Sequence, residues 1–327
     1  MTDAASRHQP VMLQRCVDLL APSLDHDGAV VIDGTLGMGG HTEAILQQCP
    51  RATVVGIDRD LDAIALASER LEDFGDRFLA HHAEYDDIAG ALALAGAEAA
   101  DGILLDLGVS SLQIDEAERG FSYAQDAPLD MRMNRSDPVT AADLLRDADA
   151  RELTRILREY GEERFAARIA ESIVKRRAEK PLTRTAELTD LVRACIPAAS
   201  RQPGSNPAKR TFQALRIAVN RELEVLEAAI PAAIESTRVG GRIVVMAYQS
   251  LEDRIVKTAF AAGATASAPP GLPVIPEDDQ PYLRLLTRGA EKASSQEAED
   301  NPRSKPVRLR AAERTRPTPP SRLRRAA

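Results

Sequence analysis

The chain of 327 residues has few aromatic residues, few cysteines and no long apolar run. Aromatic residues make up 3% of it and tryptophan is absent, so its core must be built from aliphatic side chains. Cys16, Cys49 and Cys195 show no Cys-x-x-Cys spacing, which argues against a disulfide framework or a structural zinc site. No stretch approaches the ~18 apolar residues of a membrane span, and no signal peptide is visible. These absences predict a soluble cytoplasmic protein.

What the chain does have is a series of short, apolar, β-branched runs separated by segments that suit helices. The runs lie at residues 29–33, 53–58, 78–81, 102–106 and 241–247, with helices expected at 41–49 and 61–71. This alternation predicts an α/β fold with a doubly wound parallel sheet. The fifth run starts about 135 residues after the fourth, far more than a crossover needs, so the chain is expected to contain an inserted domain.

The insert shows no convincing strand and is predicted to be helical. Its expected helices lie at residues 141–146, 151–160, 162–177, 185–194 and 210–229, the last leading back to the sheet. We therefore expect a discontinuous sheet domain at 1–111 and 214–314. An inserted helical domain would occupy 112–213, and a disordered basic tail would occupy 315–327.

The turn after the first run is rich in glycine and begins with an acid. Asp33 is followed by glycines at positions 34, 37, 39 and 40, and Asp58 ends the second run. A carboxylate at that point can accept hydrogen bonds from both hydroxyls of a ribose. The spacing does not match Gly-x-Gly-x-x-Gly, which disfavours a nicotinamide oxidoreductase. An acid-x-Gly pattern is typical of S-adenosyl-L-methionine folds, whose cationic cofactor favours carboxylates; a tight turn in another α/β protein is the alternative.

Basic residues gather in two places. On the predicted helix at 162–177, three cations lie within ~40° of one another on one face: Arg164, Arg168 and Lys175. Such a face beside a cofactor cleft would suit an RNA backbone, and an ordinary solvated face is the alternative. The second place is 303–327, with nine basic residues and one acid in a chain of net charge −8. This asymmetry suggests an anionic partner, or else a solvated tail from Arg314 onward.

Nine segments, in order, carry a resemblance to one known family. They are HQPVML at 8–13, DGTLGMGGH at 33–41, GILLDLGVSS at 102–111, RGFS at 119–122, LDMRM at 129–133, YGEER at 160–164, TFQALRI at 211–217, SLEDR at 250–254 and NPR at 301–303. Together they resemble the bacterial S-adenosylmethionine-dependent 16S ribosomal RNA (cytosine-N4)-methyltransferase family. The resemblance implies a class I methyltransferase-type (Rossmann-like) fold that methylates the N4 of a cytidine in the decoding region of 16S RNA, within the small ribosomal subunit.

The resemblance also assigns cofactor contacts in this chain. It points to Gly39, Gly40, His41, Asp58, Tyr85, Asp106 and Gln113. Backbone at the two glycines permits close approach of a ligand, and Tyr85 could cover one face of the adenine. Asp106 could meet the cationic amino-acid end of the cofactor.

The group that accepts a hydrogen from the cytosine amine stays open. A site must hold that nitrogen in line with the sulfonium methyl and accept a hydrogen bond from its N–H. The Pro-Pro-aromatic loop of DNA amino-methyltransferases is absent at residues 107–111. Candidates for the acceptor are Asp106, Asp130 and a main-chain carbonyl near Gly108.

The chain departs from the family's pattern in three places. Tyr248-Gln249 stands where Phe-His is common, Asn206 opens what is commonly His-Pro-Ala, and Pro306 interrupts the basic C-terminal motif. Gln and Asn keep hydrogen-bonding capacity but do not titrate near neutral pH. We therefore expect the family's histidines to support RNA or packing. A cofactor-binding ribosome-assembly factor with vestigial catalysis is the alternative function.

The last of the nine segments bears on the C-terminus. Val307 and Leu309 alternate with Arg308 and Arg310, so residues 301–310 are expected to be ordered or to become ordered on RNA. Residues 317–327 offer Leu323 as their one large apolar side chain and are expected to be dispensable.

Overall fold

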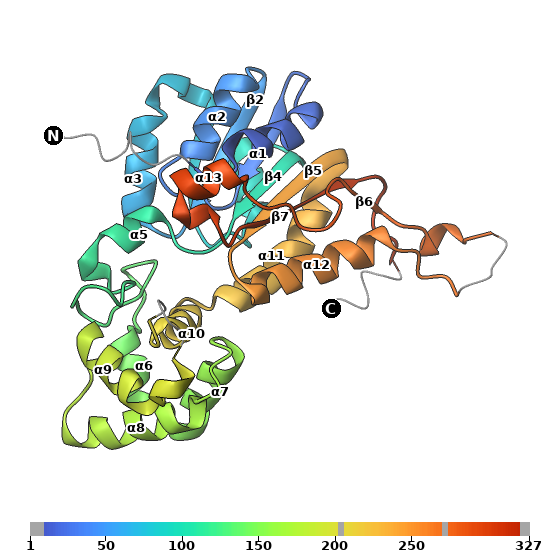
Figure 1. Cartoon of the computed structure of the whole chain (residues 1–327). Helices are drawn as coiled ribbons and strands as arrows, with labels where there is room; N and C mark the ends of the chain where they lie inside the picture. Colours follow the sequence, from blue (N-terminus) through green and yellow to red (C-terminus); the bar gives the residue numbers. More distant parts are fainter. Residues whose placement is uncertain (1–9, 202–205, 270–273, 321–327) are drawn as a thin grey trace. The chain divides into compact units, whose positions relative to one another are not determined.

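The computed structural model describes residues 10–201, 206–269 and 274–320, which form two compact units (Figure 1). The sheet unit comprises Met1–Gly108 and Glu224–Ala327, and the helical unit comprises Val109–Leu223. The second boundary follows Leu223 where the sequence suggested Gln213, because the helix between these positions packs against the other helices of the insert. The first two residues of the 8–13 segment and residues 321–327 of the predicted tail lie outside the described residues.

The sheet unit is built on a seven-stranded sheet, counted over the described residues, in the order β3-β2-β1-β4-β5-β7-β6. Its strands are β1 (Ala29–Asp33), β2 (Ala52–Asp58), β3 (Phe78–His82), β4 (Ala100–Asp106), β5 (Thr237–Ala247), β6 (Leu283–Leu285) and β7 (Arg308–Arg314). The first five run parallel, and β7 is antiparallel to both β5 and β6. The doubly wound α/β fold and its five predicted strands are confirmed, and β6 and β7 are additional.

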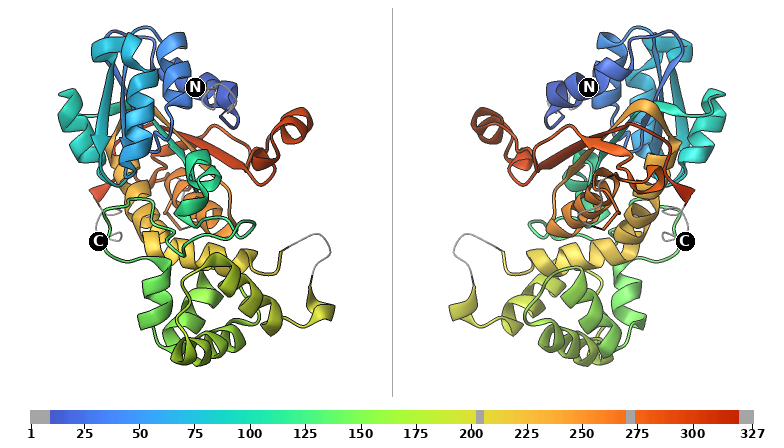
Figure 2. Two further views of the ribbon diagram at one scale, coloured as in Figure 1. Left: turned by 90° about the vertical axis from the view of Figure 1, so that its left-hand side faces the viewer. Right: turned by 90° about the vertical axis from the view of Figure 1, so that its right-hand side faces the viewer.

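Helices cover both faces of this sheet (Figures 1 and 2). They are α1 (Leu13–Leu20), α2 (Gly40–Gln48), α3 (Leu61–Arg70), α4 (Ile88–Ala95), α11 (Glu222–Ser236) and α12 (Ser250–Ala264). A further short helix, α13 (Ser295–Asp300), buries none of its residues. Short 3₁₀ turns lie at Ala21–Ser23, Glu72–Arg77, Glu277–Asp279 and Pro302–Ser304. Both faces of the central strands are therefore buried, which explains why the strands read as continuous apolar runs.

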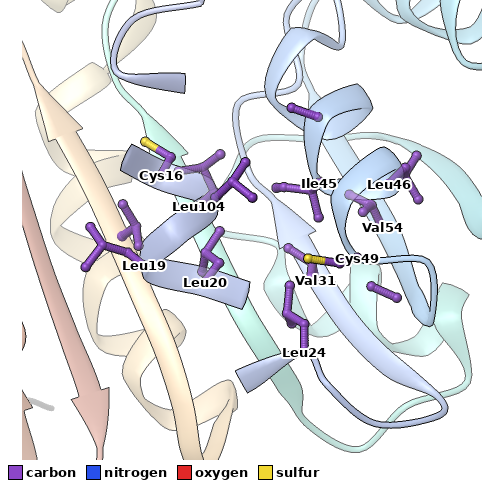
Figure 3. Packing of buried hydrophobic residues seen from close by; sticks show 14 of the residues in the cluster. Cys16, Leu19, Leu20, Leu24, Val31, Ile45, Leu46, Cys49, Val54 and Leu104 are labelled. Carbon is purple, nitrogen blue, oxygen red and sulfur yellow. The ribbon is translucent and has the colours of Figure 1, made fainter. Parts of the chain in front are cut away.

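Two aliphatic cores result from this arrangement, one on each face of the sheet. Val31 of β1 and Leu104 of β4 pack with Cys16 and Leu20 of α1 and with Ile45 of α2 (Figure 3). The alternate residues of the same strands join α4, α11 and α12 in the second core. The five side chains Val31, Leu104, Cys16, Leu20 and Ile45 are fully buried, and none of them is aromatic, as the composition of the chain predicts.

The helical unit has its own core and no strand among the residues described for it. Its helices are α5 (Ser111–Asp115), α6 (Ala141–Asp147), α7 (Ala150–Glu159), α8 (Ala166–Glu179), α9 (Thr185–Cys195) and α10 (Lys209–Asn220), with 3₁₀ turns at Ala117–Arg119 and Ala198–Ser200. Two predicted helices need correction. The one at 210–229 is two helices, because Arg221 has φ 52° and ends α10, and the one at 162–177 begins only at Ala166, after Glu162 with φ 48°.

Candidate cofactor site and basic surfaces

Three carboxylates lie at the carboxyl ends of three neighbouring strands. Asp33 ends β1, Asp58 ends β2 and Asp106 ends β4, and β1 lies between the other two strands. The strand order reverses between β1 and β4, and ligands of open α/β sheets bind outside the carboxyl ends of strands at such a switch point. Asp58 and the glycine-rich turn, which the sequence analysis assigned to one site, therefore lie next to each other in the structure.

Asp58 holds the glycine-rich turn from the neighbouring strand. Its Oδ2 accepts a hydrogen bond from the Gly37 backbone N–H at 2.8 Å, and its Oδ1 accepts one from the Asp60 N–H at 2.9 Å. Burial nevertheless raises the pKa of Asp58 to about 6, because these two bonds offset only part of the desolvation. Each oxygen keeps a second lone pair, so the carboxylate can still accept from ligand hydroxyls.

The two glycines before α2 are required for different reasons. Gly39 has φ 77°, a left-handed conformation that favours glycine. At Gly40, a Cβ would stand 2.4 Å from Cγ of Pro10. The identity of Gly40 thus follows from packing alone, and its backbone contact with a cofactor stays a prediction.

His41 and Asp106 face each other across the start of α2. His41 Nε2 lies 3.1 Å from the Val11 carbonyl, which can only accept, so Nε2 carries the hydrogen. His41 Nδ1 lies 3.7 Å from Asp106 Oδ2. Burial raises the pKa of Asp106 above its ordinary value, against the opposing effects of His41 and of the Tyr248 hydroxyl, which donates to Oδ1 at 2.7 Å.

Asp33 serves the turn itself. Its Oδ2 accepts from the Thr42 hydroxyl at 2.7 Å and its Oδ1 accepts from the Thr35 N–H at 3.2 Å. It is 1% exposed, and burial raises its pKa. Asp33 therefore fixes the conformation of the loop, while Asp58 and Asp106 flank it.

Tyr85, which follows β3, comes close to the same loop. A Cβ placed on Gly34 would stand 3.3 Å from the Tyr85 Cβ and 2.5 Å from Leu105 Cδ2. Glycine at position 34 is what allows this approach. The predicted aromatic contact thus lies beside the glycine-rich turn.

Gln113 lies in the other unit, on α5. Its side-chain Oε1 accepts from the Ser110 backbone N–H at 3.1 Å. The Gln113 backbone N–H donates to Ser110 Oγ at 3.3 Å, and the two bonds form a capping box. The structure thus gives Gln113 a local role, and its predicted contact with the cofactor stays a prediction.

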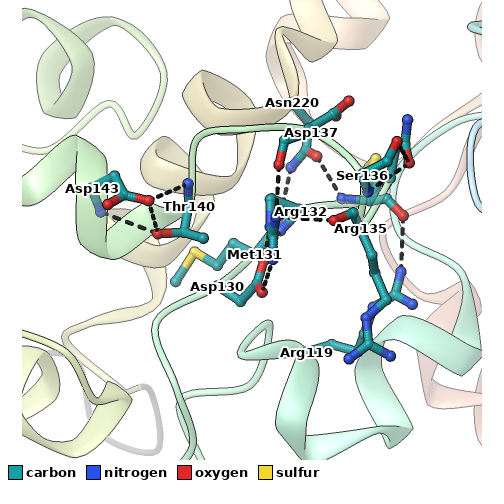
Figure 4. A network of polar contacts seen from close by, with 12 residues as sticks. Arg119, Asp130, Met131, Arg132, Arg135, Ser136, Asp137, Thr140, Asp143 and Asn220 are labelled. Carbon is teal, nitrogen blue, oxygen red and sulfur yellow. Dashed lines mark hydrogen bonds and ion pairs between the residues drawn. The ribbon is translucent and has the colours of Figure 1, made fainter.

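Asp130, the second candidate acceptor, is paired within its own loop. Arg132 donates to Oδ1 from Nε and to Oδ2 from Nη2, both at 2.7 Å (Figure 4). Partial burial raises the pKa of Asp130, but the bonds from Arg132 lower it by more, so it lies below its ordinary value. Asn220 ties this loop to α10 by donating to the Met131 carbonyl at 2.7 Å.

The predicted RNA-binding cations are exposed and unpaired within the described part of the chain. Arg168 and Lys175 share a face of α8, opposite the fully buried Ile169 and Ile173. Arg164 lies in the turn before the helix, so its predicted position on the helical face is wrong. By contrast, Arg177 on the same helix donates to the carbonyls of the α6 end.

The positions that depart from the family's pattern have local partners. Gln249 is the N-cap of α12, where its Nε2 donates to Glu252 Oε1 at 2.8 Å. Asn206 Oδ1 accepts from the Ala208 N–H at 2.9 Å, in the turn that starts α10. Tyr248 contacts Asp106, as described above, a contact that the sequence did not predict.

Part of the basic C-terminal stretch, Arg308–Arg314, forms an internal strand, β7. β7 lies between β5 and β6, and its Leu309 is fully buried. Arg310 pairs with Asp253 at 2.8 Å and Arg314 pairs with Glu235 at 3.1 Å. The expected order of residues 301–310 is confirmed by the 3₁₀ turn at Pro302–Ser304 and by β7.

The predicted tail at 315–327 is anchored at its start. Thr315 N–H donates to the Tyr282 carbonyl at 2.9 Å, and Arg316 pairs with Glu277 at 3.2 Å. Disorder is therefore wrong for these first two residues.

None of the helices in 10–201, 206–269 and 274–320 is long and apolar enough to cross a membrane. Within the same ranges, no group of three or more His, Cys, Asp or Glu side chains is arranged to hold a metal ion.

Comparison with known proteins gives matches over nearly the whole chain. Residues 5–315 match the model of the MraW methylase family. "Ribosomal RNA small subunit methyltransferase H" of Beutenbergia cavernae is 62% identical over 316 residues, which cover 97% of this chain and 95% of the relative. The protein of the same name from Streptomyces avermitilis is 56% identical over 311 residues, covering 95% of this chain and 98% of the relative. A solved structure of an rRNA methylase from Streptococcus thermophilus aligns with 93% of this chain and 94% of its own at 12% identity, with a TM-score of 0.42.

Proposed function

The chain belongs to the MraW methylase family, and on that premise we propose that it transfers a methyl group from S-adenosyl-L-methionine to N4 of a cytidine in the decoding region of 16S ribosomal RNA. The observation that carries the proposal is the pair of carboxylates, Asp58 and Asp106, on either side of the glycine-rich turn. Neither acid pairs with a Lys or Arg among the described residues, and burial raises the pKa of both, so the two suit a ligand that brings positive charge. We place the reaction in the cytoplasm, on the small ribosomal subunit.

Different residues around the turn would contact different parts of the cofactor. Asp58 accepts from the ribose hydroxyls with the lone pairs that Gly37 and Asp60 leave, and Tyr85 covers the adenine. Asp106 meets the ammonium through Oδ2, because its Oδ1 is bonded to Tyr248. When bound, S-adenosylmethionine supplies a methyl group made electrophilic by the sulfonium.

The cytosine amine needs an acceptor for one N–H, because its lone pair is delocalised into the ring. Asp130 is paired with Arg132, and Asp106 is occupied by the ammonium in this proposal. A main-chain carbonyl near Gly108 remains, and it accepts without needing to titrate. Gly108 has φ 101°, a conformation that turns the chain sharply directly after β4. We therefore assign the acceptor to this turn.

The cations of the helical unit suit the substrate. Arg164, Arg168 and Lys175 are exposed and have no ion pair with any described residue, so their charge is available to RNA phosphates. We propose that this surface binds the 16S RNA backbone. Phosphate contacts of this kind fix position and contribute affinity, while they carry little sequence information.

The alternative, a cofactor-binding assembly factor without catalysis, was motivated by the missing histidines. The caps formed by Gln249 and Asn206 support a structural duty at those positions, which favours the enzyme. The two functions separate in cells. Mass analysis of 16S RNA from cells with and without the gene is expected to show loss of one methyl on a single cytidine. An unchanged methylation pattern would favour the assembly factor.

A further inference from the structure

Tyr248 connects two strands at the candidate site. It directly follows β5, the neighbour of β4 in the sheet, and its hydroxyl reaches the residue that ends β4. The distance from the Tyr248 Oη to Asp106 Oδ1 is 2.7 Å, and Tyr248 gives the one side-chain hydrogen bond that Asp106 receives from the described residues. The ring also passes close to Gly108, where a Cβ would stand 3.7 Å from Tyr248 Cδ2.

The other described groups around Asp106 do not hydrogen-bond to its carboxylate, so the Tyr248 hydroxyl has a role that they do not share. His41 on α2 faces the other carboxylate oxygen, and Asp33 at the end of β1 and Cys16 on α1 are the further titratable groups nearby. The Asp106 backbone N–H is already committed to Thr35 Oγ1, at 2.6 Å. No other described side chain therefore fixes the rotation of the carboxylate about its Cβ–Cγ bond.

We propose that Tyr248 is a positioning residue, whose hydroxyl holds Asp106 Oδ1 so that Oδ2 is presented to the ammonium of the cofactor. This inference rests on the proposed role of Asp106. A carboxylate held by one donor loses less freedom when a cation binds to its second oxygen. The phenylalanine common at this position in the family has no hydroxyl, so only chains with tyrosine at this position can make this hydrogen bond to the aspartate.

The hydroxyl is also suited to a permanent donor role. Burial, with the nearby charge of Asp106, raises the pKa of Tyr248, so the phenol keeps its proton at all physiological pH values. The charge of Glu252 on α12 adds to this effect on the pKa of Tyr248. A donor that never ionises favours the charged form of Asp106.

The test compares Tyr248→Phe with the full-length wild type, using calorimetry with S-adenosylhomocysteine between about pH 5.5 and 8.5. This probe keeps the ammonium and the ribose and needs no RNA. At pH 7.5 we expect Tyr248→Phe to bind about tenfold more weakly, within the range for hydrogen bonds to charged groups. Without the donor the pKa of Asp106 rises further, so affinity should also be lost at a higher pH on acidification than in the wild type.

Tyr282→Phe is the matched control. Tyr282 is also buried, but it precedes β6, whose Leu283 pairs with Arg314 at the end of β7 remote from Tyr248. It should bind the probe like the wild type. Thermal unfolding of both variants checks that the fold is kept, since phenylalanine preserves the ring.

Asp106→Asn separates the two claims. If it weakens binding while Tyr248→Phe binds within twofold of the wild type at every pH, the inference about Tyr248 is wrong and the role of Asp106 stands. If Asp106→Asn itself binds normally, the proposed role of Asp106 fails. In the double variant, Tyr248→Phe should add little to Asp106→Asn, and a full additive loss would contradict action through Asp106.

Discussion

The β7 strand and the α8 helix both carry clustered basic residues, and the fold treats them in opposite ways. Arg310 and Arg314 on β7 pair with Asp253 and Glu235 from distant parts of the chain. Arg168 and Lys175 on α8 are exposed and have no ion pair with any residue the structure describes. In sequence, the C-terminal cluster is the stronger candidate for an anionic partner, since it holds nine bases and one acid.

A run of positive charge therefore indicates an anionic partner only where the fold supplies no acids to pair with it. The carboxylates that neutralise β7 are spread over α11 and α12, where no local pattern connects them with the C-terminus. The α8 cations sit on a solvated face whose opposite side is core. Charges that the fold leaves unpaired are the better candidates for RNA contacts.

The largest expected effect comes from removing β7. Truncation before Asn301 takes away the strand between β5 and β6 together with its buried side chains. We expect loss of the cooperative unfolding transition and of turnover, because a sheet cannot keep its order without an internal strand. Calorimetry and soluble yield measure this. A truncated chain that unfolds like the wild type would show that the strand is not structural.

Next in size is the loss of a partner in the β7 ion pairs. Asp253 is 7% exposed and accepts from both Arg310 and Arg308, so Asp253→Asn should lower the free energy of unfolding by about 1.5–3 kcal/mol, the range for hydrogen bonds to charged groups. Denaturant titration measures the change. Glu69→Gln on α3, an exposed acid with no ion pair among the described residues, is the matched control and should change stability by less than about 0.5 kcal/mol. If Asp253→Asn and Glu69→Gln lowered the free energy of unfolding equally, the ion pairs of β7 would not contribute to stability.

A carboxylate left for a ligand should behave differently from Asp253. Asp58→Ala should weaken S-adenosylmethionine binding by about 1.5–3 kcal/mol, through loss of charge-assisted hydrogen bonds to the ribose. Calorimetry measures the affinity. Unchanged affinity would remove Asp58 from the site.

The pH dependence of stability also reports on Asp58. Its pKa in the fold, about 6, lies above the ordinary 3.8, so the folded state binds the proton more tightly than the unfolded state. Without ligand, the contribution of Asp58 to the unfolding free energy of the wild type should therefore be lost as pH rises from about 4 through 6, and Asp58→Asn should lack this contribution. Denaturant titrations at several pH values test it, and identical pH profiles for the two proteins would contradict the assigned burial.

Arg168 and Lys175 on α8, with Arg164 in the turn before it, form the α8 surface, which should affect RNA binding and little else. Replacing Arg164, Arg168 and Lys175 together by Ala should weaken binding to small-subunit RNA and reduce the salt slope by about one unit, or slightly less, per lost phosphate contact. Cofactor affinity and stability should stay close to wild type. A triple variant with wild-type salt dependence would show that this face is merely solvated.

The smallest effect is expected at the C-terminus itself. Truncation after Arg316 keeps β7 and the pair between Arg316 and Glu277. Stability and turnover should be close to wild type, with at most a modest loss of nonspecific RNA affinity. If this truncation behaves like the one before Asn301, the last eleven residues have a role that the structure does not explain.

The parts of the fold that sequence predicts are those encoded locally. The buried strands β1, β2 and β4 are continuous apolar runs ending in acid, and the carboxyl ends of neighbouring parallel strands meet at one edge. The sequence alone therefore predicts that Asp58 lies beside the glycine-rich turn. The resemblance to the family points to Gly39 and Gly40, and the left-handed backbone of Gly39 and the close packing of Gly40 against Pro10 give the physical reasons.

The parts that sequence missed depend on contacts between distant residues. β7 carries alanines and arginines that suit a central strand only once Asp253 and Glu235 neutralise them. The left-handed residues Glu162 and Arg221 interrupt otherwise continuous helical patterns, which propensity alone does not reveal. The bond from Tyr248 to Asp106 joins residues 142 positions apart, and its one signal was a hydroxyl where the family commonly has none.

Methyl transfer with purified components is the decisive test of the proposed activity. The full chain is incubated with isotopically labelled S-adenosylmethionine and small ribosomal subunits from cells that lack the gene, and the RNA is digested and analysed by mass. We predict one labelled methyl per 16S RNA, on N4 of a single cytidine, with transfer reduced by Asp58→Ala and by the triple replacement on the α8 surface. No transfer to any cytidine, from a folded chain that binds the cofactor, would contradict the account.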